Sequence, residues 1–134
     1  MVRLREGADV TLLAYGVLLN QALAAAERLS AEGIQAEVLK LNRISPLDYA
    51  TIGGFFSGGR KRLLVVEDSF GVGCVGQRLA AILAEHGNAP EQLILKNLGK
   101  TFAPEGSVAQ LEERFGLDAA GIVAAVREAM RDER

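Results

Sequence analysis

Short apolar runs recur along the chain and have the length and pattern of strands. Residues 10–15 form a nearly continuous apolar run, as expected of a strand that is covered on both faces, and 62–68 is the clearest run of all. A short alternating run occupies 1–5, and less regular apolar runs occupy 35–41 and 93–98. The pattern predicts a strand over each of these ranges.

Segments with apolar residues at helical spacing lie between these runs. The spacing predicts helices over 18–29 and 75–86, each followed by a glycine suited to the end of a helix. Between them, Ser45 is expected to cap a short helix that has Pro46 in its first turn and Asp48 as an early acid.

Two further helices are expected after the last predicted strand. Ser107 and Gln110 have the spacing of a capping box, which predicts a helix through Phe115. Asp118 is suited to cap a final helix, whose inward face would carry Ile122, Val126, Ala129 and Met130.

The alternation of strands and helices predicts the fold class. Two parallel strands need a crossover connection, and a helix in that crossover covers one face of the sheet. We therefore expect a three-layer α/β/α protein, in which helices cover both faces of a largely parallel sheet. Residues 1–134 contain no internal repeat and no long linker, so a single domain is expected.

Composition and charge narrow the function classes. The 134 residues are 49% hydrophobic and 24% charged, with a formal net charge of -2 and no basic stripe, so no nucleic-acid partner is expected. No apolar run reaches the roughly 18 residues of a membrane helix, and no signal peptide opens the chain. We expect a cytoplasmic protein without a membrane partner. The basic run Arg60, Lys61, Arg62 is interpreted as a solvated turn.

One cysteine and one histidine exclude a disulfide framework and a Cys/His zinc cluster, and no metal site is predicted. Cys74 lies near a helix N-terminus, which would lower the pKa of its thiol, but no base or second thiol accompanies it. It is interpreted as a small packing residue rather than a nucleophile. His86 falls in the last turn of a predicted helix, where capping is favoured over catalysis.

The motif G-x-G-x-x-G occurs at Gly71, Gly73 and Gly76, between a predicted strand and a predicted helix. In a dinucleotide site, such a loop holds pyrophosphate at the helix N-terminus, and an acid about 20 residues later binds the ribose. No acid stands at the end of the strand at 93–98. Close packing of the turn and helix on the sheet is therefore the favoured reason for the glycines.

Glu67 and Asp68 directly precede this loop, and their negative charges would repel a pyrophosphate. Ser69 follows them, with no histidine near it in the sequence. The two acids are interpreted as acceptors for the amides of the following loop, with an acid/base pair as the alternative.

Three segments resemble landmarks of the transketolase C-terminal domain, in the same order and spacing. They are REGADVTLLAYG at 5–16, LKLNRISPLD at 39–48 and LLVVEDSFGVGCVG at 63–76. This domain is the last module of transketolases, pyruvate dehydrogenase beta subunits and 1-deoxy-D-xylulose-5-phosphate synthases, all of which use thiamine diphosphate.

The tail of the chain is most similar to that of the synthases. It reads NLGKTFAPEGS at 97–107 and GLD at 116–118, while Asn97, Gly99 and Lys100 depart from the glycine, proline and aspartate that are usual there. The resemblance thus implies the C-terminal structural and assembly domain of a larger enzyme that makes 1-deoxy-D-xylulose 5-phosphate and CO2 from pyruvate and glyceraldehyde 3-phosphate, in isoprenoid precursor synthesis.

Two alternatives remain open. One is a separate C-terminal subunit of a transketolase or of a pyruvate dehydrogenase beta-like enzyme. The other is an independent nucleotide-binding regulatory domain that uses the loop at 71–76.

The resemblance also implies what this domain lacks. In such enzymes thiamine diphosphate and Mg2+ are held by other modules, which contain a G-D-G sequence that is absent from these residues. No catalytic, cofactor-binding or metal-binding residue carries over, and the isolated domain is expected to be inactive. The implied partners are the other domains or subunits of the parent enzyme, in a homodimer.

The family fold implies a sheet of five strands in the order 1-3-2-4-5, with the first strand antiparallel. A crevice would then open at the switch point between the strands at 10–15 and 62–68. We expect this crevice to pack on a neighbouring module or subunit, with Tyr15 and Phe70 as apolar contacts. The candidate residues of this surface are Tyr15, Gly16, Glu67, Asp68, Ser69, Phe70, Gly71, Gly73 and Gly76.

Overall fold

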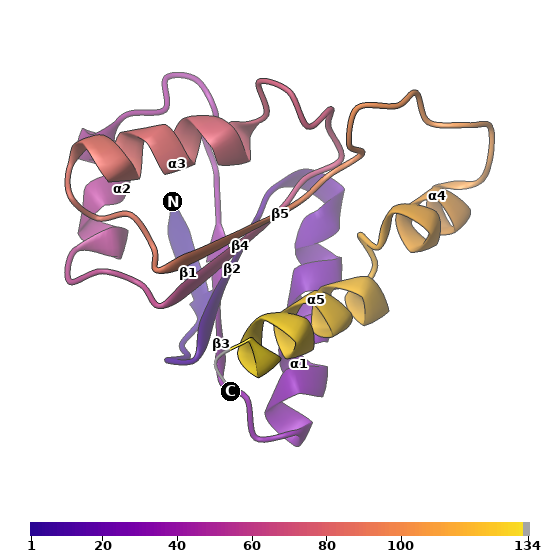
Figure 1. The fold of residues 1–134 in the computed structure, drawn as a ribbon, viewed down its shortest axis with the longest axis horizontal. Coiled ribbons are helices and arrows are strands. Elements are labelled where there is room, and N and C mark those ends of the chain that lie inside the picture. The colour runs from indigo at the N-terminus through magenta and orange to yellow at the C-terminus, as the bar shows by residue number, and fades with distance from the viewer. Residues whose placement is uncertain (133–134) are drawn as a thin grey trace.

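A central sheet with the strand order β1-β3-β2-β4-β5 organises the computed structural model, which describes residues 1–132 (Figure 1). β1 is antiparallel to β3, and the other neighbouring pairs are parallel. Strand order and the antiparallel first strand are both as the resemblance implies. The strands are β1 (Val2–Arg5), β2 (Val10–Ala14), β3 (Ala36–Lys40), β4 (Arg62–Val66) and β5 (Gln92–Lys96).

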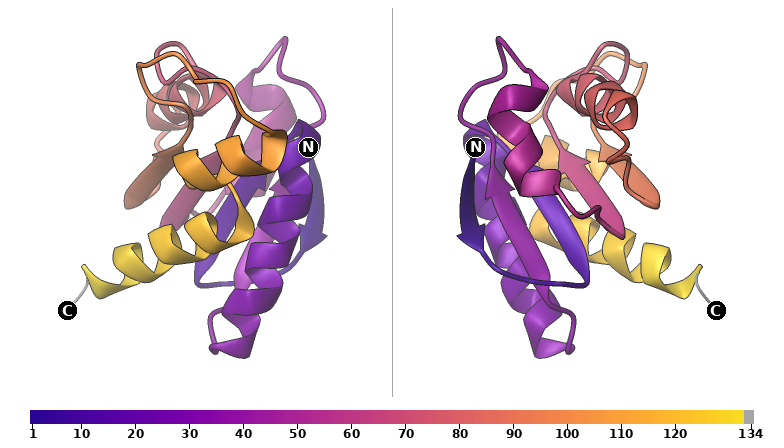
Figure 2. Two further views of the ribbon diagram at one scale, coloured as in Figure 1. Left: turned by 90° about the vertical axis from the view of Figure 1, so that its right-hand side faces the viewer. Right: turned by 90° about the vertical axis from the view of Figure 1, so that its left-hand side faces the viewer.

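Helices cover both faces of the sheet, as the alternation of elements predicts (Figure 2). α1 and α5 bury their apolar residues against one face, and α2 and α3 bury theirs against the other. Between β5 and α5, the short helix α4 contributes no buried residue. The helical elements are the 3-10 turn η1 (Gly16–Leu18), α1 (Leu19–Ala31), α2 (Tyr49–Phe56), α3 (Val75–Glu85), α4 (Val108–Phe115) and α5 (Ala119–Arg131).

Alternate residues of the central strands serve the two cores. Leu12 and Leu64 face α1 and α5, while Leu13 and Val65 face α2 and α3, and all four side chains are fully buried. The continuous apolar runs follow from this, because a strand that is covered on both faces has no solvated side. The sheet therefore holds the carboxyl ends of β2 and β4 side by side, which positions the candidate site.

The second helix begins later than predicted. Asp48, rather than Ser45, is its N-cap, because the Asp48 carboxylate accepts a hydrogen bond of 3.0 Å from the Thr51 backbone N–H. Ser45 and Pro46 lie in the loop before the helix. At the other predicted caps, Ser107 forms a complete capping box with Gln110, and Asp118 accepts from the Gly121 N–H. Both of those predictions are confirmed.

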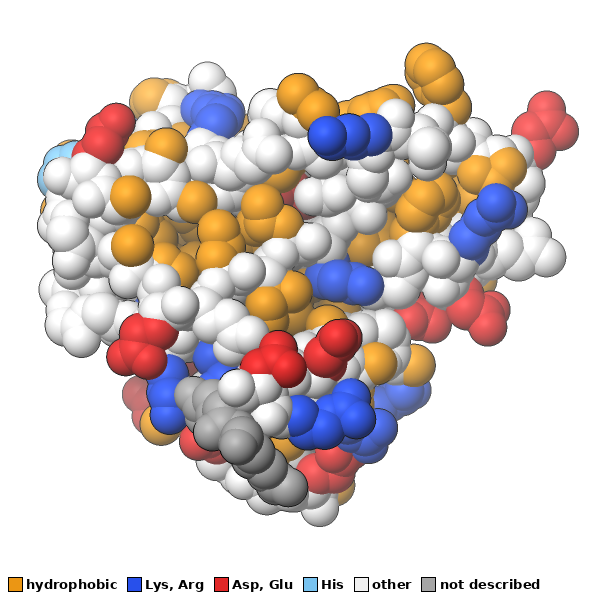
Figure 3. Space-filling view, viewed as in Figure 1, with side chains coloured by type: hydrophobic (Ala, Val, Ile, Leu, Met, Phe, Trp, Pro, Cys, Tyr) orange, Lys and Arg blue, Asp and Glu red, His pale blue; other side chains and the backbone are white. Residues whose placement is uncertain are grey.

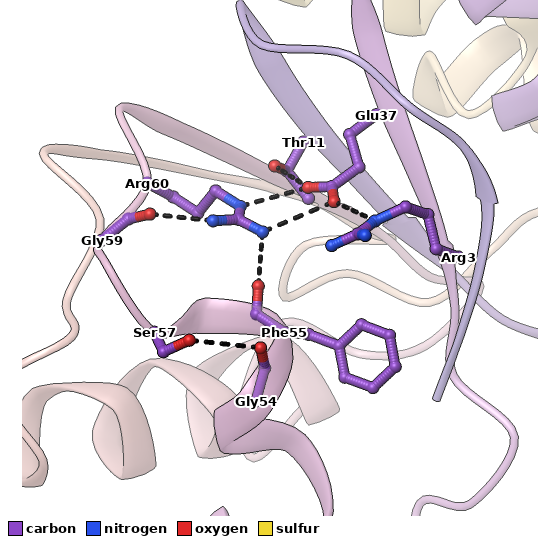
Figure 4. Close-up of polar contacts among 8 residues, drawn as sticks. All are labelled: Arg3, Thr11, Glu37, Gly54, Phe55, Ser57, Gly59 and Arg60. Carbon is purple, nitrogen blue, oxygen red and sulfur yellow. Dashed lines mark hydrogen bonds and ion pairs between the residues drawn. The ribbon is translucent and has the colours of Figure 1, made fainter.

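The prediction of a solvated turn at residues 60–62 is wrong for Arg60 and Arg62, whereas Lys61 is exposed. The Glu37 carboxylate of β3 is buried and accepts hydrogen bonds from Arg3 Nε at 2.8 Å, Arg60 Nε at 3.1 Å and the Thr11 hydroxyl at 2.7 Å (Figure 4). Arg60 also donates to the carbonyl oxygens of Phe55 and Gly59.

Arg62 is buried as well, and its Nη1 donates to the Asp9 carbonyl oxygen at 3.1 Å. A buried carboxylate needs charged partners to offset its lost hydration, and Glu37 lies 23 positions before Arg60. Arg60 is therefore half-buried and Arg62 buried because of partners far away in the sequence, which the local basic run does not indicate.

Candidate functional site

The carboxyl end of β4 and the start of α3 meet at Glu67. The side chain is 1% exposed, and its two oxygens accept the backbone N–H groups of Val75 at 3.0 Å and Gly76 at 2.7 Å. These amides belong to the first turn of α3, which has no intrahelical acceptor for them. A carboxylate also favours the positive end of the helix dipole. The interpretation of Glu67 as an acceptor for loop amides is confirmed.

Two hydroxyl groups complete the environment of the Glu67 carboxylate. Ser69 Oγ donates to it at 2.8 Å, and the Tyr15 hydroxyl, at the end of β2, donates to it at 3.1 Å. Burial raises the pKa of Tyr15 to about 12, and the nearby Glu67 charge acts in the same direction. Glu67 thus joins β2, β4 and α3 by hydrogen bonds within the chain.

The glycines of the loop each have a structural reason. A Cβ on Gly76 would lie 2.6 Å from Leu95 Cδ2 and 2.9 Å from Glu67 Oε2, so the helix start packs directly on the sheet. Gly73 has a φ of 71°, in the left-handed region that favours glycine. A Cβ on Gly71 would lie 3.1 Å from Asn97 Oδ1 and 3.2 Å from the Gly99 carbonyl oxygen, which is a tight fit. Close packing, the favoured interpretation of the motif, is confirmed for Gly76.

Asp68 does not form an acid/base pair with Glu67. It is exposed, whereas Glu67 is buried and bound to four donors of the same chain. Asp68 instead lines a cavity of about 220 Å³ at the carboxyl ends of the strands, together with Val17, Leu98, Ala103, Val108, Leu111, Glu112 and Leu117. Most of these side chains are apolar, so the cavity suits an apolar group better than a charged one.

Beside this cavity two phenylalanines contact each other. Phe70 and Phe102 are 42% and 89% exposed, and their rings meet edge to face with centroids 5.7 Å apart. The exposed position of Phe70 agrees with its predicted role as a contact, and that role stays a prediction. Phe102 and Leu98 were not among the candidate residues, since nothing in a loop sequence indicates which crevice the loop will border.

Cys74 and His86 have structural positions. Burial raises the pKa of the Cys74 thiol, so the expected lowering by the helix N-terminus is wrong. The thiol is buried, which supports its interpretation as a packing residue. His86 Nδ1 lies 2.9 Å from the Ile82 carbonyl oxygen, and the ring stacks on Tyr49 with centroids 3.9 Å apart. The predicted capping role of His86 is confirmed.

The site offers little to a phosphate or a metal ion. The Val75 and Gly76 amides, which a phosphate would use at the start of α3, are held by Glu67. Within residues 1–132, no group of three or more His, Cys, Asp and Glu side chains could hold a metal ion. In the same part of the chain, no helix has both the length and the apolar character that crossing a bilayer requires.

Known proteins are similar to this chain in sequence and in fold. The chain matches the family described as Transketolase, C-terminal domain, over residues 1–122. It is 37% identical over 126 residues to the 6-deoxy-6-sulfo-D-fructose transketolase subunit SqwH of Clostridium sp. (strain MSTE9), a match that covers 93% of this chain and 38% of that protein. It is 33% identical over 134 residues to the 1-deoxy-D-xylulose-5-phosphate synthase of Syntrophotalea carbinolica, covering 98% of this chain and 20% of that protein.

A solved structure has a similar fold. A split gene transketolase, described as an inactive beta4 tetramer, superposes with a TM-score of 0.80 at 30% sequence identity, over 99% of this chain and 43% of that chain. The chain therefore spans 20% to 43% of the length of these three proteins.

Proposed function

The chain belongs to the transketolase C-terminal domain family, and on this basis we propose that it is the structural and assembly domain of a cytoplasmic, thiamine diphosphate-dependent enzyme. One observation carries the proposal: Glu67, the only buried acid at the switch point among the described residues, is bound by Tyr15, Ser69, Val75 and Gly76 of its own chain. Because Glu67 is also only 1% exposed, its carboxylate is not accessible to a substrate.

Thiamine diphosphate does not fit the residues of this domain. Its diphosphate would need donors and a divalent cation, but the α3 amides are taken and the described residues form no metal-binding group. Gly76 leaves no space either, since Leu95 and Glu67 already occupy the position that a Cβ would take there. We therefore assign the cofactor and Mg2+ to other modules of the parent enzyme, and the residues 1–134 to one domain of it.

For the parent enzyme we propose 1-deoxy-D-xylulose-5-phosphate synthase. The relative from Syntrophotalea carbinolica supports this, because its match extends over 98% of the chain and so includes the tail after the last strand. The reaction would join pyruvate and glyceraldehyde 3-phosphate with loss of CO2, for isoprenoid precursor synthesis.

A separate C-terminal subunit of a transketolase is the second candidate. Two observations favour it: the relative SqwH is named a transketolase subunit, and the split gene transketolase has a TM-score of 0.80. In this case the chain would act only after it binds a second polypeptide that carries the cofactor.

In either parent, the crevice surface defined above from Tyr15 to Gly76 would pack on a neighbouring module or subunit of a homodimer. Phe70 supplies exposed apolar area and is 42% exposed, while Asp68 lies at the rim. Gly16, with a φ of 61°, turns the chain from β2 into η1 at the base of this surface.

Calorimetry of the chain with NAD, ATP and thiamine diphosphate tests the assembly role. We expect no binding of any of them, because the amides at the start of α3 are occupied. A thermal unfolding scan of the same sample establishes that the chain is folded. Micromolar binding of a nucleotide or of thiamine diphosphate by the folded chain would contradict the proposal and support the regulatory alternative.

Assay of the complete enzyme distinguishes the two parents. Release of CO2 from pyruvate that depends on glyceraldehyde 3-phosphate supports the synthase. Transfer of a two-carbon ketol unit from a ketose phosphate without release of CO2 supports the transketolase, and contradicts the synthase.

A further inference from the structure

The outer edge of β5 is open to pairing. Among residues 1–132, β5 pairs only with β4, and it is an outermost strand of the sheet. The opposite edge, β1, reads VRLR and carries two arginines, charges of the kind that protect an edge strand. β5 reads QLILK and has a single charge at its end. The two edges therefore differ in their protection against another strand.

We infer that β5 pairs antiparallel with β5 of a second copy of this chain. The Gln92 N–H donates to the Lys61 carbonyl oxygen, and the Lys96 carbonyl oxygen accepts from the Glu67 N–H, so both residues direct these groups toward β4. Backbone groups alternate in direction along a strand, so Leu93 and Leu95 direct theirs outward. A two-fold axis at Ile94 places Leu93 of one copy opposite Leu95 of the other, where each exchanges both backbone hydrogen bonds.

The side chains at this edge suit the same register. Leu95 packs with the α2 and α3 core and Ile94 with the α1 and α5 core, so Leu93, which is 37% exposed, lies on the face of Leu95. The pairing sets Leu93 against Leu95 twice and Ile94 against Ile94 once, which gives three apolar cross-strand contacts. Figure 3, in which the β5 edge of the sheet is toward the viewer, shows hydrophobic side chains gathered on that side of the molecule.

Charge complementarity selects a second copy as the partner. A cavity of about 230 Å³ between β5 and α5 is lined by Gln92, Ile94, Lys96, Ala125, Glu128, Ala129 and Asp132. α5 runs against the direction of β5, so Glu128 and Asp132, at its end, lie toward the start of β5 (Figure 1). Lys96, at the end of β5, lies instead near Gly116, just before α5.

Antiparallel pairing joins these opposite charges. With the axis at Ile94, Lys96 of one copy stands opposite Gln92 of the other, next to the acids Glu128 and Asp132. The two-fold axis repeats the contact, so each copy contributes Lys96 to one contact and Glu128 and Asp132 to the other. Among the described residues, none forms an ion pair with Lys96 within its own chain. This inference does not depend on which parent enzyme the domain serves.

Sedimentation equilibrium over a range of protein concentrations tests the pairing. We expect a reversible monomer–dimer equilibrium in the wild-type chain. Lys96→Glu should raise the dimer dissociation constant about tenfold, because the new carboxylate of each copy would lie beside Glu128 and Asp132 of the other and would be repelled by them. Adding Glu128→Lys to Lys96→Glu should recover most of the loss. Lys100→Glu makes the same change of charge in the exposed loop after β5 and should leave the equilibrium unchanged.

A backbone variant tests the strand pairing itself. Leu93→Pro removes an outward N–H without breaking the ladder to β4, so the fold should survive while the dimer is lost. Leu93→Ala keeps the N–H and serves as the control for the proline variant. It should weaken the dimer only in part. Circular dichroism establishes whether the proline variant folds. If it does not fold, the Lys96/Glu128 charge exchange decides the question without it.

The outcomes are distinct. A wild-type chain that stays monomeric up to about 1 mM would overturn the inference. So would a dimer that resists both Lys96→Glu and a folded Leu93→Pro variant, because another surface would then hold it. Amide hydrogen exchange at Leu93 and Leu95 that slows as the protein concentration rises would support it.

Discussion

Glu67 Oε2 accepts the backbone N–H of Gly76 at 2.7 Å, and this bond joins the end of β4 to the first turn of α3. A G-x-G-x-x-G loop normally leaves such amides free for the phosphates of a nucleotide. Here an acid of the same chain takes the position of the anion. The motif therefore serves the connection between sheet and helix.

Glu67→Gln should lower the free energy of unfolding by about 2 kcal/mol. A neutral amide has one acceptor oxygen, so it cannot accept both the Val75 and Gly76 N–H groups, and its NH2 group would face one of them. Urea unfolding followed by circular dichroism measures the change. Asp68→Asn is the matched control, and it should stay within about 0.5 kcal/mol of wild type because Asp68 is exposed. Equal effects of the two variants would show that the burial of Glu67 is unimportant.

Gly76→Ala should cost about 1 to 3 kcal/mol in unfolding free energy. The added methyl group would meet Leu95 Cδ2 at 2.6 Å and Glu67 Oε2 at 2.9 Å, and it would push α3 away from the sheet. Gly54→Ala is the control within a helix, since nothing lies within 4 Å of its Cβ position. It should be neutral or stabilising by up to about 1 kcal/mol. Stability of both variants at the wild-type level would argue against close packing at Gly76.

The stability of the chain should fall at alkaline pH through Tyr15. Its pKa is raised from 10.0 to about 12 in the folded state, so the unfolded chain loses the phenolic proton first. The stabilisation is complete below pH 10 and is lost as the pH rises through about 12. Ultraviolet titration of tyrosinate should show one tyrosine that ionises near pH 12, absent from Tyr15→Phe. Persistence of that transition in the variant would assign it to another tyrosine.

Glu37→Ala should destabilise the fold by about 3 to 5 kcal/mol, because Arg3 and Arg60 would keep their charges beside a buried gap. A double-mutant cycle of Glu37→Ala with Arg60→Ala should give a coupling energy of about 1 to 3 kcal/mol. Denaturant unfolding measures all four proteins of the cycle. Glu27→Ala, on the exposed side of α1, is the control and should change little. Additive effects would mean that the Glu37–Arg60 contact contributes nothing to stability.

Local patterns predicted the elements of this fold well. The strands at β2 and β4 are recognisable because their faces are both covered, so that their apolar runs are continuous. The capping residues Ser107 and Asp118 were recognisable because each accepts a bond from a residue three positions later. The same signal predicts a cap at Ser45, and this prediction is wrong. Asp48, three positions later, is the cap instead, because its carboxylate accepts the Thr51 N–H.

The partners of the charged groups were not predictable in this way. Tyr15 lies 52 positions from Glu67. The resemblance implies that β2 and β4 are neighbours, but no local pattern indicates that these two side chains will bind each other. A basic run in a turn is usually solvated, so the sequence predicts a surface position for Arg60. The acid that draws it inward belongs to β3, and only the strand order brings the two together.

By itself the sequence determined the α/β class, the places of most strands and helices, and the resemblance to one family. Each of these depends on residues within a few positions of one another, or on the order of short segments along the chain. Tertiary structure alone decided that Tyr15 binds Glu67, and that the buried Glu37 carboxylate binds Arg3 and Arg60. These contacts join groups that are far apart in the chain. They form because a buried polar or charged group is stable only when it is hydrogen-bonded or paired, wherever its partner lies in the sequence.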